Sequence, residues 1–404
     1  DLDSDSDGLP DSEELLLGTD PTEADSDSDG IWDIVEVAYG SDPLDNADFP
    51  PAEVFFVILP YLALAHEFRN LDFNTDIQHA DVMIMVDLSG SMSGEHTNLK
   101  SGINNVVISG ISAEMPEAAY GLTKFGTWDD FASLYQVTQR ITMSSSAVQT
   151  AVNTITTCGG ADEGHTEALW QLSTGTGYNN DGYVIPAANC TSQLGSVGGG
   201  CFRTGAMPIY IMCTDEAFLG SPPGHTRTQA IAEMNTIGAK FIGIDSGGGV
   251  AGTDFTAISN GTGSVNQSNQ PFNFQISSDG SGLSSTVVNA VLDLTQNIQL
   301  AEVNTQKASV ANPQSVDTTL FIKAVTPVSA TPPSGVNSFD TTTFYGVDPG
   351  TMLTFNVDFY NDFYNPPTSE VTMFQAVIRV MGEGMELDSR PVYIIVPGRG
   401  GAGT

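Results

Sequence analysis

Apolar residues follow two different periods along this chain, and each period predicts a different kind of domain. Between residues 80 and 302, continuous apolar runs such as 82–86 alternate with segments of helical spacing such as 287–298. Continuous runs suit parallel strands that are buried on both faces, with helices between them. We therefore expect a doubly wound, mostly parallel α/β domain over residues 80–302. Its expected strands are 82–86, 119–125, 207–213 and 240–245, and its expected helices are 145–156, 164–173, 227–237 and 283–300.

Residues 174–206 interrupt this alternation with Gly, Asn and Ser, and we expect them to form a surface insertion. From about residue 318 the apolar positions recur with period two, as at Leu353, Phe355, Val357 and Phe359. This period predicts an antiparallel β-sandwich of immunoglobulin-like size over residues 318–397, followed by a flexible tail at 398–404.

The first 50 residues are the most acidic part of the chain, with 17 of its 49 acids and no Lys or Arg. The acids follow the pattern D-x-D-x-D-G-x-x-D-x-x-E twice, 22 residues apart. The positions are Asp3, Asp5, Asp7, Asp11 and Glu14, and then Asp25, Asp27, Asp29, Asp33 and Glu36. Alternate carboxylates on a tight loop, with Gly at the sharp turn, supply the oxygens that Ca²⁺ prefers. The phased repeat favours calcium binding over a disordered acidic tail.

A second group of oxygen ligands follows the buried strand 82–86. Asp87, Ser89 and Ser91 alternate on one loop, Asp215 follows the strand 207–213, and the loop 158–167 offers Glu163 and Thr166. Ligands of open α/β sheets bind at the carboxyl ends of the strands. One carboxylate with two hydroxyls suits Mg²⁺, which keeps several of its waters. We expect the neighbouring His165 to be a solvated loop residue.

Both groups resemble known families. The acidic repeats resemble thrombospondin type 3 repeats of secreted bacterial proteins, which implies structural calcium and a stiff spacer of residues 1–50. Asp87-x-Ser89-x-Ser91 with Thr214-Asp215 resembles a von Willebrand factor A domain that carries a metal-ion-dependent adhesion site (MIDAS). In that family the DxSxS residues bind the metal, the later Asp acts through water, and a partner's carboxylate completes the coordination.

The α/β region is also similar to the A domains of integrin β-subunits. Glu163-Gly164-x-x-Glu167-Ala168 is similar to a motif whose Glu binds the metal there, which implies a ligand role for Glu163, while simpler A domains imply Thr166. The stretch 125–130 resembles an integrin motif whose Asp binds an accessory calcium, which implies that role for Asp130. Integrin A domains also have an adjacent acidic pair that binds a further calcium, and here that pair is reduced to Gly94-Glu95. Because integrin A domains are inserted into a sandwich, the resemblance implies that residues 51–79 add strands to the C-terminal one.

Charge and cysteine content bound the setting. The formal charge of −37 argues against nucleic acid as a partner, and no apolar run has the length of a membrane span. The four cysteines lack CxxC spacing, which argues against zinc. In an acidic, Lys-poor chain they suit an extracellular setting. Cys190 with Cys201 is the easiest disulfide, Cys158 with Cys213 is the remaining pair, and two other pairings stay open.

These observations predict an extracellular or cell-surface binding protein, and we expect it to be a processed product. Its Mg²⁺ site would capture an Asp or Glu of a partner protein, or of another copy of the chain in a filament or layer, with Ca²⁺-loaded repeats as the spacer. The alternatives are a purely structural protein whose metal site binds no ligand, and a metal-dependent hydrolase. No nucleophile–base pattern supports the hydrolase, so we expect no enzymatic activity.

Overall fold

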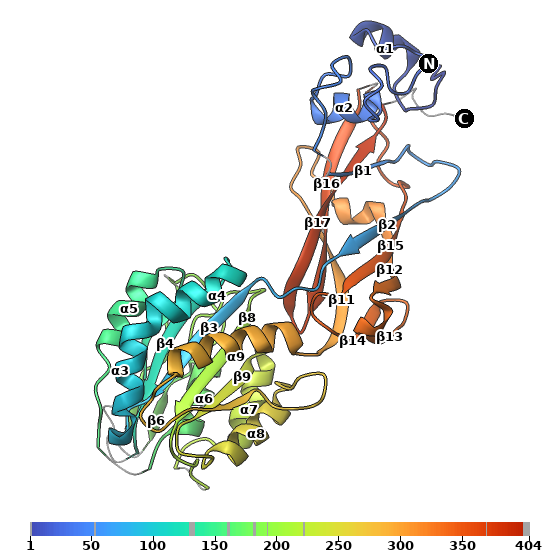
Figure 1. The fold of residues 1–404 in the computed structure, drawn as a ribbon. Helices are drawn as coiled ribbons and strands as arrows, with labels where there is room; N and C mark the ends of the chain where they lie inside the picture. Colours follow the sequence, from blue (N-terminus) through green and yellow to red (C-terminus); the bar gives the residue numbers. More distant parts are fainter. Residues whose placement is uncertain are drawn as a thin grey trace.

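The structure is a computed structural model that describes residues 2–51, 54–128, 134–159, 162–180, 183–191, 193–220, 223–368 and 370–398. Asp130, and the predicted tail from residue 399 onward, lie outside the described residues. The molecule is elongated, with an α/β domain (residues 80–298) at one end, the C-terminal sheets in the middle, and the N-terminal repeats (residues 3–46) at the other end (Figure 1).

A six-stranded sheet forms the centre of the α/β domain, in the order β10-β9-β8-β3-β4-β5. The strands are β3 (Ala80–Asp87), β4 (Ala119–Phe125), β5 (Tyr135–Thr142), β8 (Met207–Thr214), β9 (Lys240–Asp245) and β10 (Asn273–Gln275). All neighbours run parallel except β5, which is antiparallel to β4. Every residue of β3 is buried, as its continuous apolar run predicts.

Helices cover both faces of this sheet, because the side chains of β3 alternate between two cores. Val82, Ile84 and Val86 belong to one apolar cluster, whereas Met83 and Met85 belong to the other. The first face carries α3 (Ser93–Gly102), the π-helical η2 (Ile103–Ile108), α4 (Ser109–Glu114), α5 (Ser145–Asn153) and α9 (Leu283–Asn297). The second carries α6 (His165–Thr174), α7 (Arg227–Thr236) and α8 (Gly252–Gly261). Short 3₁₀ turns are η1 (Gly90–Met92), η3 (Thr318–Phe321) and η4 (Pro333–Gly335).

The 174–206 segment adds a small hairpin, β6 (Tyr178–Asn180) with β7 (Tyr183–Ile185), and a disulfide between Cys190 and Cys201. The expected second disulfide is wrong, because Cys158 and Cys213 are free thiols. Cys213 is buried within β8, and this burial raises the pKa of its thiol well above the usual value. It therefore serves the core as a small apolar residue.

The C-terminal sheets are a six-stranded sheet of order β1-β17-β16-β11-β14-β13 and a three-stranded sheet of order β12-β15-β2. The strands are β1 (Phe55–Ile58), β2 (Glu67–Phe73), β11 (Leu300–Ser309), β12 (Ile322–Thr331), β13 (Val336–Phe339), β14 (Thr343–Val347), β15 (Met352–Phe359), β16 (Thr372–Gly382) and β17 (Met385–Val396). The sheets face each other, since the rings of Phe344 and Phe355 lie 5.2 Å apart.

These sheets differ from the expected antiparallel arrangement in two respects. Strand β1 pairs in parallel with β17, so the larger sheet is mixed. Strand β11 lies before residue 318 yet pairs with both β14 and β16; its polar sequence buries only Leu300 and Val303, and so lacks the period-two signal. Strands β1 and β2, from the 51–79 segment, pair with β17 and β15.

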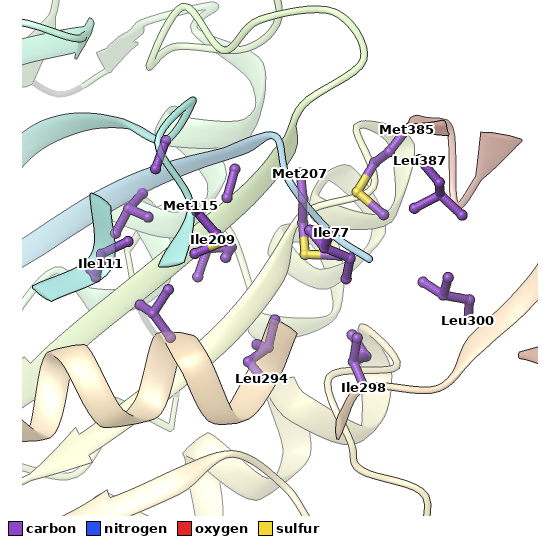
Figure 2. Packing of buried hydrophobic residues seen from close by; sticks show 14 of the residues in the cluster. Ile77, Ile111, Met115, Met207, Ile209, Leu294, Ile298, Leu300, Met385 and Leu387 are labelled. Carbon is purple, nitrogen blue, oxygen red and sulfur yellow. The ribbon is translucent and has the colours of Figure 1, made fainter. Parts of the chain in front are cut away.

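The α/β domain and the C-terminal sheets share one continuous core. Figure 2 shows Met385 and Leu387, at the tip of the β16–β17 hairpin, beside Met207 of the α/β domain and Ile77 of the segment that leads into β3. Leu300 extends this packing from the start of β11. Polar contacts flank the junction, where Lys240 Nζ lies 3.2 Å from Glu383 Oε2 and the Glu386 N–H donates to the Gly205 carbonyl.

The N-terminal repeats pack on the opposite end of the same hairpin. Each contains one short helix, α1 (Asp11–Leu17) or α2 (Asp33–Tyr39), and each helix ends at a glycine in the left-handed conformation, Gly18 or Gly40. Leu9 and Ile34 are buried against Ile395 of β17. The repeats are therefore anchored to the C-terminal sheets through a small apolar core.

Candidate metal sites

The loop after β3 carries the first candidate site, at the carboxyl edge of the α/β sheet. The Asp87 carboxylate is fully buried, and its Oδ1 accepts a hydrogen bond of 2.8 Å from the Ser89 backbone N–H. The Ser89 and Ser91 hydroxyl oxygens lie 3.2 Å apart. The alternating spacing of the motif therefore turns all three oxygen-bearing side chains toward one small region.

Three residues that were not predicted as ligands hold Asp87 in place. The Thr214 hydroxyl, at the end of β8, donates a 2.6 Å hydrogen bond to Asp87 Oδ2. The only hydrogen of that hydroxyl is used in the bond to Asp87, so the hydroxyl oxygen can only accept from His165. The His165 Nε2–H, at 3.0 Å, therefore donates to the Thr214 oxygen. His96 Nε2 lies 2.7 Å from the Asp87 carbonyl. The expectation for His165 was wrong: it is buried, and this burial lowers its pKa to about 3, so its imidazole is neutral.

Further carboxylates gather at this edge. Glu163 is buried, and burial together with the charges of Asp87, Glu216 and Asp215 raises its pKa to about 7. Burial likewise raises the pKa of Asp87 to about 6. Asp215 Oδ1 is buried without a hydrogen-bond partner among the described residues. Like charges that are buried together cost free energy unless a cation neutralises them.

Glu95 adds a negative charge that the sequence analysis took for the remnant of a lost site. It is buried in the first turn of α3, and its Oε2 lacks a partner within the described chain. Burial, together with the charge of Asp215, raises the pKa of Glu95. Thr166 lies buried in the first turn of α6. The region offers oxygens and orphaned carboxylates, which fit a hard divalent cation such as Mg²⁺.

The tightest carboxylate groups of the described residues lie in the N-terminal repeats. One oxygen each of Asp3, Asp5 and Asp7 lie within 4.8 Å of one another, and so do oxygens of Asp25, Asp27 and Asp29. Glu14 is buried, and neither of its oxygens has a hydrogen-bond partner among the residues that the structure describes. Burial and the charges of Asp5 and Asp7 raise the pKa of Glu14 to about 8. Glu36 occupies the matching place, with a pKa raised to about 7 by burial.

Asp11 and Asp33 also accept hydrogen bonds within their own repeats. The two oxygens of Asp11 accept hydrogen bonds from the backbone N–H and the hydroxyl of Ser4. Asp33 accepts the same pair from Ser26. Each aspartate thus links the start of its acidic loop to the helix that follows.

Comparison with known proteins identifies the repeats. Residues 3–24 and 25–46 each match the family model of the bacterial TSP3 repeat, so this segment consists of two such repeats, as the sequence predicted. No curated protein sequence gives a significant match to the chain.

Solved structures give distant likenesses over a larger part of the chain. A von Willebrand factor type A protein from Catenulispora acidiphila is 12% identical, with a TM-score of 0.39, over 85% of this chain and 72% of that one. The open form of the pilus adhesin SpaC from Lactobacillus rhamnosus GG is 12% identical (TM-score 0.35; 80% and 44% covered). Proximal thread matrix protein 1 of the mussel byssus is 14% identical (TM-score 0.35; 56% and 48% covered). This chain spans less than half of the last two. Among the described residues, no helix has both the length and the apolar character needed to cross a membrane.

Proposed function

We propose that this protein is an extracellular adhesion or self-assembly protein that binds an acidic side chain of a partner at a Mg²⁺-loaded site. Asp87, Ser89 and Ser91 would hold the ion together with Glu163 or Thr166, and Asp215 would act through water. A bound Mg²⁺ supplies a positive charge that can accept a carboxylate oxygen from outside. The observation that carries the proposal is the set of buried, unpartnered carboxylate oxygens around Asp87.

The charge of the chain supports a metal-mediated contact. With 49 acidic and 12 basic residues, the protein repels acidic partners over most of its surface. A divalent cation at the edge of the sheet reverses this locally, both for a foreign protein offering Asp or Glu and for a second copy of this acidic chain. The contact would accordingly depend on the ion and not on complementary side chains.

The same geometry argues against hydrolysis. A metal-dependent hydrolase needs a base that can take a proton from water or from a nucleophile. His165 is neutral and would suit that role by type, but it is 1% exposed, and its unprotonated Nδ1, the nitrogen that could accept a proton, is buried away from solvent. His96 is also buried, with its Nε2 at the Asp87 carbonyl. Both histidines position the aspartate.

The TSP3 repeats would serve as a calcium-stabilised spacer. Their clustered aspartates and buried glutamates repel one another, and bound Ca²⁺ removes that repulsion. Such a spacer suits the calcium concentration outside cells, in keeping with the single disulfide and the acidic composition.

Substitution of Asp87 tests the proposal. In saturating Ca²⁺, calorimetric titration of the parent protein with Mg²⁺ should reveal one further site, and Asp87→Ala should abolish it. The control Asp293→Ala, on the outer surface of α9, should bind Mg²⁺ like the parent. Light scattering and electron microscopy then compare the association of parent and Asp87→Ala with and without Mg²⁺. Equal Mg²⁺ binding by Asp87→Ala, or a parent without a site beyond the repeats, would refute the proposal.

A further inference from the structure

A cavity of about 330 Å³ lies at the outer edge of the α/β sheet, and none of its lining residues belongs to the candidate metal sites. Strand β5 forms one side through Tyr135 and Arg140. The C-terminal half of α6 contributes Gln171, and β7 contributes Val184 and Ile185. A volume of this size is in the range of small-molecule sites.

The walls of this cavity are built by the insertion and are held in place. The Ala188 N–H donates to the Gly175 carbonyl and the Gly199 N–H donates to the Leu172 carbonyl, both at 2.8 Å. The disulfide between Cys190 and Cys201 closes the loop that carries Gly199. Gln171 is buried with both ends of its amide hydrogen-bonded. The cavity is therefore pre-formed, which reduces the entropy lost when a ligand binds.

The charge inside the cavity is unusual for this chain. Arg140 has no ion-pair partner among the described residues, although acids outnumber bases four to one. Its Nε is buried without a hydrogen bond in the described structure. The other five described arginines all form ion pairs: Arg69 with Glu67, Arg203 with Asp81, Arg227 with Asp254, Arg379 with Glu386, and Arg390 with Asp388. A buried guanidinium N–H without a partner is costly, so it favours an anionic ligand.

A second donor accompanies the arginine. Tyr135 is 9% exposed, and its hydroxyl is buried without a hydrogen-bond partner in the described part of the chain. Arg140 is close enough to act on Tyr135 electrostatically. A guanidinium with a phenol matches the oxygens of a carboxylate. The remaining lining includes Val137, Val184, Ile185 and Pro186, which suit an apolar group.

We propose that this cavity binds a carboxylate carried by an apolar group, with Arg140 and Tyr135 contacting the carboxylate and Val184 and Ile185 contacting the apolar part. The inference is independent of the metal-dependent function proposed above. Two sources offer this chemistry, a free organic acid and an acidic side chain flanked by apolar residues in a protein.

The test is a calorimetric titration of the full chain in Ca²⁺ with two pairs of probes. Phenylacetate and phenylacetamide represent the free acid and its neutral analogue. The peptides acetyl-Val-Glu-Val-amide and acetyl-Val-Gln-Val-amide represent the protein source. We expect at least one carboxylate probe to bind at least about tenfold more tightly than its neutral partner. Binding of phenylacetate alone assigns a free acid, and binding of the Glu peptide alone assigns a protein segment.

Variants locate the binding. Arg140→Gln should lower the affinity for the carboxylate probe by at least about tenfold, whereas Arg390→Gln, on β17, should leave this affinity unchanged. Tyr135→Phe removes only the hydroxyl, should fold at least as well as the parent, and should still weaken binding, so it serves if Arg140→Gln fails to fold. The parent should bind the probe equally with and without Mg²⁺, which separates this cavity from the metal site.

Three outcomes would overturn the proposal. The first is equal affinity for the acid and its neutral analogue, and the second is unchanged affinity in both Arg140→Gln and Tyr135→Phe. The third is that neither carboxylate probe binds at concentrations up to about 10 mM, because a specific pocket of this size should have a higher affinity than that.

Discussion

The hydrogen bond from Thr214 to Asp87 gives a sharp test of how the candidate Mg²⁺ site is supported. Thr214→Val keeps the shape of the side chain but removes the hydroxyl that lies 2.6 Å from Asp87 Oδ2. A hydrogen bond to a charged group contributes about 1.5–3 kcal/mol, and the His165 N–H would lose its acceptor as well. We expect the free energy of unfolding to fall by about 3 kcal/mol.

Thr123 provides a matched control in strand β4, which lies on the other side of β3 from Thr214. It is also fully buried, but its hydroxyl oxygen has no hydrogen-bond partner among the described residues. Removing an unsatisfied buried hydroxyl removes a desolvation cost, so Thr123→Val should leave stability unchanged or raise it by about 1 kcal/mol. The same substitution on the two strands that flank β3 should therefore be destabilising in β8 but not in β4.

The measurement is urea unfolding followed by tryptophan fluorescence, since Trp128 and Trp170 lie in the α/β domain, in Ca²⁺ without Mg²⁺. The effect of Thr214→Val should be larger at pH 8, where Asp87 with its pKa of about 6 is ionised, than at pH 5. Mg²⁺ affinity should fall by about 10–100-fold, as is usual when a group that orients a metal ligand is lost. If the two valine variants differ by less than about 0.5 kcal/mol at pH 8, the reasoning is wrong.

Three further predictions concern other parts of the molecule. Leu300→Ala, at the buried junction, should lower the free energy of unfolding by about 2–5 kcal/mol, whereas Leu320→Ala, at a half-exposed site, should change it by less than about 0.5 kcal/mol in the same urea assay. Iodoacetamide should label the half-buried Cys158 of the native protein before Cys213, and mass spectrometry showing the reverse order would contradict the assigned burial. Without Ca²⁺, the folded repeats hold protons on carboxyl groups such as Glu14, whose pKa is raised from 4.5 to about 8. Their stability should therefore fall as pH rises from about 5 to 8, because these protons are lost. Ca²⁺ should reverse this trend and bind more tightly at pH 8 than at pH 6 by calorimetry; equal affinities would argue against protonation of Glu14.

The sequence predicted those parts of the fold in which one short segment carries the whole signal. The buried run of β3, the phased acidic repeats and the period-two strands of the C-terminal sheets are local patterns, and the structure contains all of them. Strand β11 was not predicted because it has neither a continuous nor an alternating apolar run. In β5 the apolar residues Tyr135, Val137 and Ile141 stand at alternate positions, a signal that was overlooked. Helix α8 begins inside a glycine-rich segment that reads as a loop.

The candidate sites show the same division. The spacing of Asp87, Ser89 and Ser91 identifies one edge of the sheet, but the support from Thr214 crosses 127 residues of sequence. No local pattern could show that His165 is buried. In the repeats a signal was present and overlooked: Ser4 and Ser26 recur with the same 22-residue period as Asp11 and Asp33, to which they are hydrogen-bonded. Cys158 was wrongly paired with Cys213 as the remaining pair, although Cys213 ends the predicted strand 207–213 and is buried there.

The β16–β17 hairpin has a mechanical consequence. Its tip at Met385 packs into the α/β domain, and its other end, at Ile395, packs against the TSP3 repeats. Tension between a ligand held by the α/β domain and an attachment at the repeats would therefore run along these two strands. Their hydrogen bonds lie perpendicular to the strands, so such a load would shear many bonds together and would not open them one at a time. The weak point under force would be the small apolar contact between the repeats and Ile395, and calcium, by holding the repeats folded, would set its strength.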